Sequence, residues 1–258
     1  MEGVLALDAL ATAYHALLWP LLRTSSFVAI APVLGARNVT PRARLTMALA
    51  LALLLAMVLP APPEMPLFGA DWWLAVVQQV VVGLAIGFIF LFAFEAVALG
   101  AEAISAAAGL SFAQLTDPLR GTSSGVLAAF MTVIAMLIFL AMDGHLRLID
   151  ALVTSFTLFP VGGALPGPEQ IDAWLRFSAI IFTGAAQVSL PVLTALLAAN
   201  LALGLVSRAA PALNLFAIGF PATLLLVLLA MWAWLPAITA PLGELFDETF
   251  LVAAGRAS

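Results

Sequence analysis

The chain has 258 residues, of which 64% are hydrophobic and only 9% are charged, and its formal net charge at pH 7 is -5. A soluble domain carries about 25% charged residues, so most of this surface cannot face water. These proportions exclude a soluble enzyme, a secreted domain and a nucleic-acid-binding protein. They predict an integral membrane protein.

The hydrophobic residues are grouped into stretches that are long enough to be membrane helices. A helix needs ~20 apolar residues to cross a hydrocarbon core of about 30 Å. The pattern predicts an all-α polytopic membrane protein with about six hydrophobic helices, at residues 9–33, 45–60, 72–94, 121–142, 177–207 and 210–235. The second of these stretches is barely long enough to cross the membrane, and the fifth is too long for an upright crossing.

The connections between these stretches are marked by proline and glycine. Four prolines in residues 60–66 lack an N–H group and predict an exposed, extended connection. Residues 159–168 hold three prolines and three glycines and predict a second irregular connection. Residues 95–120, which are small and apolar but contain three acidic side chains, predict a short helix followed by a loop.

Several helices should bend or pack closely. Pro20, Pro191 and Pro221 lie inside hydrophobic stretches, where each removes a main-chain hydrogen bond and predicts a kink. Gly83 and Gly87 form a GxxxG pattern that lets two helices approach closely. The partner of this glycine face is either another helix of the same chain or another subunit.

A few titratable residues lie in or near the hydrophobic stretches, and the sequence allows two interpretations of each. Arg23 lies well inside the first stretch, so it has either a buried partner or a long stem that reaches an interface. Glu95 and Glu102 are seven residues apart on nearly the same helix face, which indicates a polar helix edge or an ion site. His15 and His145 are either structural or functional, and neither has the neighbours of a metal site.

No group of residues predicts catalysis or a bound cofactor. The chain has no cysteine and no lysine, and its serines lack the motifs that accompany a nucleophile. The residues leave two function classes, a secondary transporter of a small molecule or a subunit of a larger membrane assembly. Because no internal repeat of broken helices is evident, the subunit is favoured.

Three groups of segments, taken in order, carry a resemblance to one known family over nearly the whole chain. They are residues 22–27, 31–35 and 39–44; residues 109–112, 117–118, 140–145 and 155–156; and residues 190–191, 200–211 and 214–221. Together they look like the FliR family of flagellar type III export-gate proteins (FliR/SctT-like), whose counterparts serve virulence injectisomes. Members often carry Gln directly after the proline of the third group, where this chain has Ala212.

The resemblance implies a fold in two parts. Residues 1–170 would be a FliP-like helical part, and residues 171–258 a FliQ-like helical hairpin with a C-terminal tail. The hairpin would consist of the fifth and sixth stretches, with its turn near residues 208–214. Much of the hydrophobic length would then be buried against neighbouring subunits, so six stretches need not be six crossings.

The resemblance also implies a function and partners. The chain would be a non-enzymatic subunit of the flagellar protein export gate, without a cofactor, in the bacterial inner membrane within the basal body. It would form a pore-like complex with FliP-like and FliQ-like subunits and cooperate with FlhB-like and FlhA-like proteins. The cargo would be unfolded flagellar proteins.

Two sets of residues follow from the resemblance. A loop near residues 109–125 would plug the closed gate, through Gly109, Leu110, Phe112, Leu115, Asp117, Pro118 and Gly121. A second set would serve assembly or helix bending, and comprises Arg23, Pro32, Pro191, Arg208, Pro211, Asn214, Gly219 and Pro221.

Overall fold

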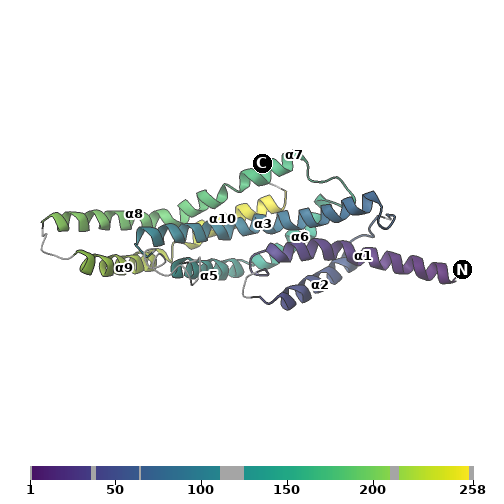
Figure 1. Ribbon diagram of the computed structural model, residues 1–258, viewed down its shortest axis with the longest axis horizontal. Helices are drawn as coiled ribbons and strands as arrows, with labels where there is room; N and C mark the ends of the chain where they lie inside the picture. The colour runs from purple at the N-terminus through teal and green to yellow at the C-terminus, as the bar shows by residue number, and fades with distance from the viewer. Residues whose placement is uncertain (1, 36–38, 64, 111–124, 210–214, 256–258) are drawn as a thin grey trace. The chain divides into compact units, whose positions relative to one another are not determined.

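The computed structural model describes residues 2–35, 39–63, 65–110, 125–209 and 215–255, and these residues form helices and connections without a strand (Figure 1). The all-α prediction is therefore confirmed for the described chain. Its helices are α1 Glu2–Ile30, α2 Pro41–Val58, α3 Ala70–Ala107, α5 Val126–Ala141, α6 Gly144–Leu158, α7 Pro168–Phe177, α8 Ile180–Ala209, α9 Leu215–Trp234 and α10 Thr239–Ala253.

Several of these helices are long and apolar enough to cross a membrane. Among the described residues, three segments qualify on their own: Pro41–Val58, Ala70–Ala107 and Pro168–Val206. Two further pairs qualify together, α5 with α6 and the later part of α9 with α10, although they are bent by 71° and 67°. The chain is thus a polytopic membrane protein with three to five candidate spans in its described part.

The third helix is longer than the sequence predicted. Residues 95–107 continue α3 without interruption, so the expected short separate helix is wrong. Alanine, the best helix former, dominates this stretch, and the lone Gly100 does not end it. Gly100 instead lets α3 approach α8, since a Cβ there would lie 2.9 Å from the carbonyl oxygen of Ala185.

The connections agree with the proline pattern, whereas three helices were not predicted. Residues 59–63 and 65–69 and residues 159–167 are non-helical, as expected. Helices α6, α7 and α10 lie in stretches that are too short or too polar to be recognised as spans. α1, α8 and α9 each continue through their internal proline.

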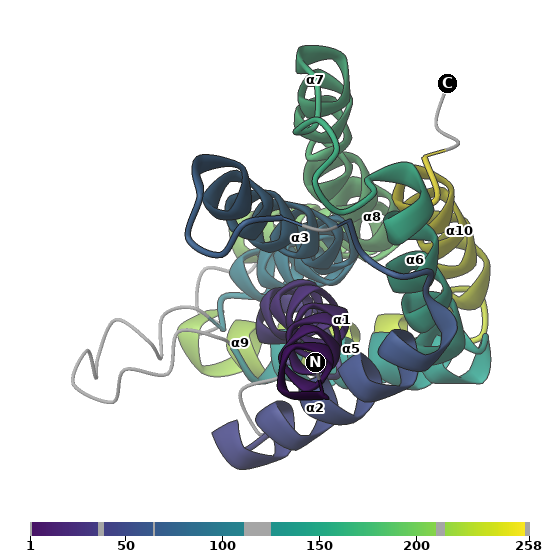
Figure 2. The same ribbon diagram turned by 90° about the vertical axis from the view of Figure 1, so that its right-hand side faces the viewer.

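The chain divides into two compact units, each with its own packing. The first comprises residues 1–91, 143–178 and 248–258, and the second residues 92–142 and 179–247. In the first unit α1 packs along α2 (Figure 2), and in the second α8 packs along α9. The core of the second unit contains Phe94, Phe139 and Phe246, whose ring centroids are 5.1 to 5.4 Å apart.

The GxxxG face of α3 packs against α1 of the same chain. A Cβ at Gly83 would overlap the hydroxyl of Ser26 and the carbonyl oxygen of Arg23. A Cβ at Gly87 would lie 3.2 Å from the Phe27 carbonyl oxygen. Of the two interpretations of the glycines, packing within the chain is therefore the one that the structure supports.

This close approach generates a prediction for stability. Gly83→Ala should destabilise the chain by roughly 1–3 kcal/mol, because the added methyl group meets main-chain atoms that can move only with α1. Gly204→Ala is the matched control, since a Cβ there has nothing within 4 Å. The free energy of unfolding of the chain, purified in detergent with any subunits that accompany it, measures both. Equal effects of the two substitutions would contradict the packing described here.

Candidate functional site

The most elaborate polar site surrounds Arg23, whose side chain is completely buried (0% exposed) in the first unit. Its Nε donates to Gln79 Oε1 at 2.8 Å, and its Nη1 donates to Ser155 Oγ at 3.1 Å. Its Nη2 donates to the carbonyl oxygen of Phe159 at 2.7 Å. The guanidinium carbon also lies 3.9 Å from the centroid of the Phe156 ring. One side chain of α1 thus joins α3, α6 and the connection that follows α6.

Gln78 continues this network into the 159–167 connection. Gln79 Nε2 donates to Gln78 Oε1 at 3.2 Å, and the same oxygen accepts the N–H of Gly162 at 3.1 Å. Irregular main chain away from water needs such partners, because unpaired N–H and C=O groups are costly. Gln78 Nε2 supplies a donor within 3.0 to 3.2 Å of three carbonyl oxygens, those of Pro160, Gly163 and Ala164.

These contacts decide between the two interpretations of Arg23. The side chain has buried partners and does not reach an interface. Its three acceptors are neutral, so hydrogen bonds and the face of Phe156 stabilise the cation where a carboxylate would be expected. The sequence carried one signal of this site, since Gln78 and Gln79 are adjacent polar residues in an otherwise apolar stretch.

The two described ends of the expected plug segment have defined geometry. α3 ends at Ala107, and Gly109, two residues later, has a φ of 76° in the left-handed region that favours glycine. The Leu110 N–H then donates to the carbonyl oxygen of Ser105 at 3.0 Å. At the far end, the N–H of Gly125 donates to Glu102 Oε1 at 2.9 Å. Phe112, Leu115, Asp117, Pro118 and Gly121 lie outside the described residues.

Leu110 also lines an apolar cavity of the second unit. The cavity has a volume of about 470 Å³ and lies among the end of α3, the first turns of α5 and the later part of α9. Val126 and Phe130 on α5 and Trp232 on α9 line it as well. Among the described residues its walls are almost entirely hydrophobic side chains, which is the lining of an apolar surface more than of a site that orients a polar substrate.

The residues expected to serve assembly are distributed over both units. Arg23 and Pro32 are buried in the first unit, where Pro32 follows the end of α1. Pro191, Arg208 and Pro221 are exposed in the second unit, on α8 and α9. Gly219 lies in the first part of α9, whereas Pro211 and Asn214 fall outside the part of the chain that the structure describes.

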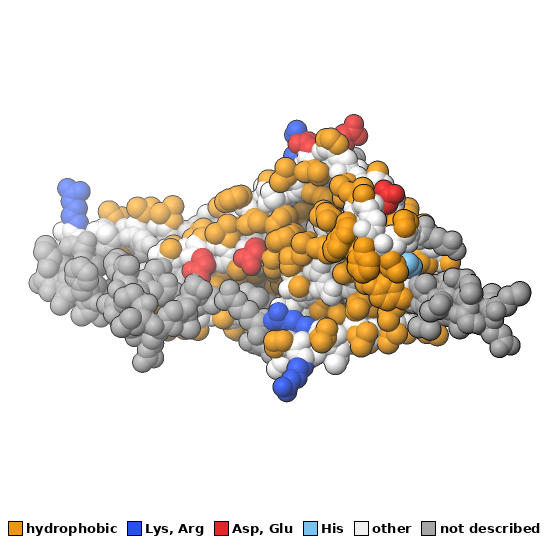
Figure 3. All heavy atoms as spheres, turned by 45° about the vertical axis from the view of Figure 1, so that its right-hand side comes forward, with side chains coloured by type: hydrophobic (Ala, Val, Ile, Leu, Met, Phe, Trp, Pro, Cys, Tyr) orange, Lys and Arg blue, Asp and Glu red, His pale blue; other side chains and the backbone are white. Residues whose placement is uncertain are grey.

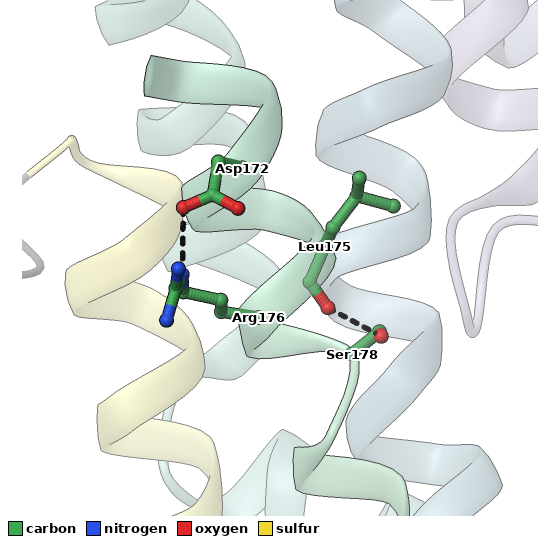
Figure 4. Close-up of polar contacts among 4 residues, drawn as sticks. All are labelled: Asp172, Leu175, Arg176 and Ser178. Atoms are coloured by element: carbon green, nitrogen blue, oxygen red, sulfur yellow. Dashed lines mark hydrogen bonds and ion pairs between the residues drawn. The ribbon is translucent and has the colours of Figure 1, made fainter. Parts of the chain in front are cut away.

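The other titratable groups that the structure describes show packing contacts and a surface ion pair. His15 is buried and stacks on Trp19, with ring centroids 6.0 Å apart and planes at 7°, which is a packing role. Within the described ranges, no group of three His, Cys, Asp or Glu side chains could hold a metal ion. On α7, Arg176 Nε donates to Asp172 Oδ2 at 2.6 Å, and both side chains are exposed (Figure 4).

Much of the described surface consists of large hydrophobic side chains (Figure 3). Only 17% of the apolar window of α2 and 22% of that in Pro168–Val206 is buried, compared with 56% for α3. Leu45, Leu49, Leu53 and Met57 form an exposed stripe at four-residue intervals along α2. A patch of this extent requires lipid or another protein as cover.

Comparison with known proteins places these features in a family. Residues 14–249 match the family described as bacterial export proteins, family 1. The chain is 41% identical over 233 residues to the flagellar biosynthetic protein FliR of Escherichia coli (strain K12), an alignment that covers 90% of this chain and 88% of that protein.

Two further FliR proteins extend the comparison to other bacteria. The FliR protein of Pectobacterium carotovorum is 35% identical over 90% of this chain and 88% of its own length. That of Bacillus subtilis (strain 168) is 32% identical over 81% of each chain. The chain therefore belongs to the FliR family of bacterial export proteins.

Proposed function

We propose that the chain is a non-enzymatic subunit of the flagellar type III protein export gate. In this proposal it forms a pore-like complex with FliP-like and FliQ-like subunits in the bacterial inner membrane, within the basal body. FlhB-like and FlhA-like proteins cooperate with that complex, and unfolded flagellar proteins are its cargo. The observation that carries the proposal is the family match over residues 14–249, together with the FliR relatives that align along most of their length.

The exposed apolar helices support a role among sister chains. α2 and the segment Pro168–Val206 have the length and composition of membrane helices but bury little of their surface within this chain. In this proposal, neighbouring subunits cover the exposed surfaces of these helices. It also divides the chain into a FliP-like part, residues 1–170, and a FliQ-like hairpin with its tail, residues 171–258, in which α8 and α9 are the paired helices.

The proposal assigns roles to the two sets of residues. The loop near residues 109–125 plugs the closed gate, and its described end residues, Gly109 and Leu110, fix where it leaves α3. Arg23 acts in assembly indirectly, because its hydrogen bonds hold the shape of the first unit that partner subunits would recognise. Arg208 and Pro221 act where they are exposed on the hairpin.

Deletion of residues 111–124 tests the plug. The expected result is a membrane that leaks small ions while the subunits still assemble in their normal ratio, since the helices on either side of the deletion remain. Ion permeability of cells or vesicles that carry the complex is the measurement, and subunit ratios after purification are the control. A membrane as tight as that with the unaltered chain would refute the plug.

Purification tests the proposal against a small-molecule transporter. The chain should be stable only when it is produced together with FliP-like and FliQ-like subunits, and it should elute with them as one complex. Chains produced alone should aggregate, because the stripe on α2 and the sides of α8 would be left uncovered. A stable isolated chain that binds a small substrate and drives its uptake into liposomes would support the transporter instead.

A further inference from the structure

Glu102 makes a contact that no sequence pattern indicated. Its Oε1 accepts the N–H of Gly125 at 2.9 Å, across 23 positions of sequence and within the second unit. Gly125 is the N-cap residue of α5, with a φ of -58° and a ψ of 152°. As a glycine it has no side chain that could cap the helix. The acceptor for this helix end therefore comes from a different helix, α3.

The first turn of α5 has no side chain of its own that could accept the N–H of Gly125. In a capping box, a Glu or Gln three residues after the N-cap accepts the N-cap N–H. The residue at that position here is Ala128, and the first turn of α5 contains no acidic residue. Glu102 thus supplies the missing half of the motif.

The setting makes this hydrogen bond difficult to replace. Gly125 is buried, so water cannot readily take over its N–H if the carboxylate is lost. The acceptor is an anionic side chain placed at the positive end of α5, which strengthens the contact. Glu95, one heptad earlier on α3, is exposed and provides a natural comparison.

Gly109 and Leu110, at the other end of the segment 109–125, also hydrogen-bond to this part of α3. The Leu110 N–H donates to the carbonyl oxygen of Ser105, and the Gly109 N–H donates to that of Ala106 at 3.1 Å. Together with Glu102, these acceptors lie on residues 102–106, which span only ~6 Å of helix. The residues at both ends of the segment, Gly109 and Leu110 at one end and Gly125 at the other, thus hydrogen-bond to little more than one turn of α3.

We propose that Glu102 is a positioning residue. Its carboxylate fixes where α5 begins relative to the end of α3, and it thereby sets the separation between the two anchor points at Gly109 and Gly125. The consequence for the gate rests on the proposed function, whereas the anchoring itself does not.

Hydrogen exchange in the full chain, purified with its partner subunits, tests the anchoring. In Glu102→Ala the amides of residues 125–129 should exchange roughly tenfold faster, as expected when a charged hydrogen bond is lost. Glu102→Gln keeps an acceptor oxygen and should restore exchange to within about twofold of the unaltered chain. Glu95→Ala, at the exposed position, should leave these amides unchanged.

Two outcomes would overturn the inference: unchanged exchange in Glu102→Ala, or exchange in Glu102→Gln as fast as in Glu102→Ala. The test is separable from that of the plug. If deletion of residues 111–124 leaves the membrane tight while Glu102→Ala still accelerates exchange at the start of α5, the plug fails and the anchoring stands.

Discussion

The buried guanidinium of Arg23 is the interaction on which the first unit depends. A cation removed from water is tolerated only when its donors are satisfied, and here three hydrogen bonds end on neutral oxygens from α3, α6 and the connection after α6. Each hydrogen bond to a charged group contributes about 1.5–3 kcal/mol. Because Gln79 also contacts Gln78, loss of Arg23 would disturb the main chain that Gln78 holds.

Small residues on α3 make this network possible. Gln79, Gly83 and Gly87 follow one another at four-residue intervals and therefore lie on one face of α3. Gly83 brings α3 so near to α1 that a Cβ would overlap the carbonyl oxygen of Arg23 itself. The glycines thus set the distance that the Gln79 side chain has to bridge. Close packing and polar contact are consequences of the same helix face.

The sequence predicted the helical class and the proline-rich connections, because composition and missing N–H groups act locally. It failed where tertiary contacts decide. The acidic residues in 95–120 predict a short helix followed by a loop, whereas α3 continues without a break to Ala107 and Glu102 contacts Gly125. Likewise, the sequence left a buried partner and an interface position open for Arg23, because its acceptors Ser155 and Phe159 are more than 130 positions away. No local pattern encodes such pairs.

A double-mutant cycle between Arg23 and Gln79 tests most directly whether this network holds the first unit together. The free energy of unfolding of the chain, purified in detergent together with its partner subunits, would be compared for Arg23→Met, Gln79→Ala and the double variant, with the exposed pair Asp172 and Arg176 as the control. The account predicts a coupling of about 1–3 kcal/mol for the buried pair. Additive effects, within about 0.5 kcal/mol, would contradict it.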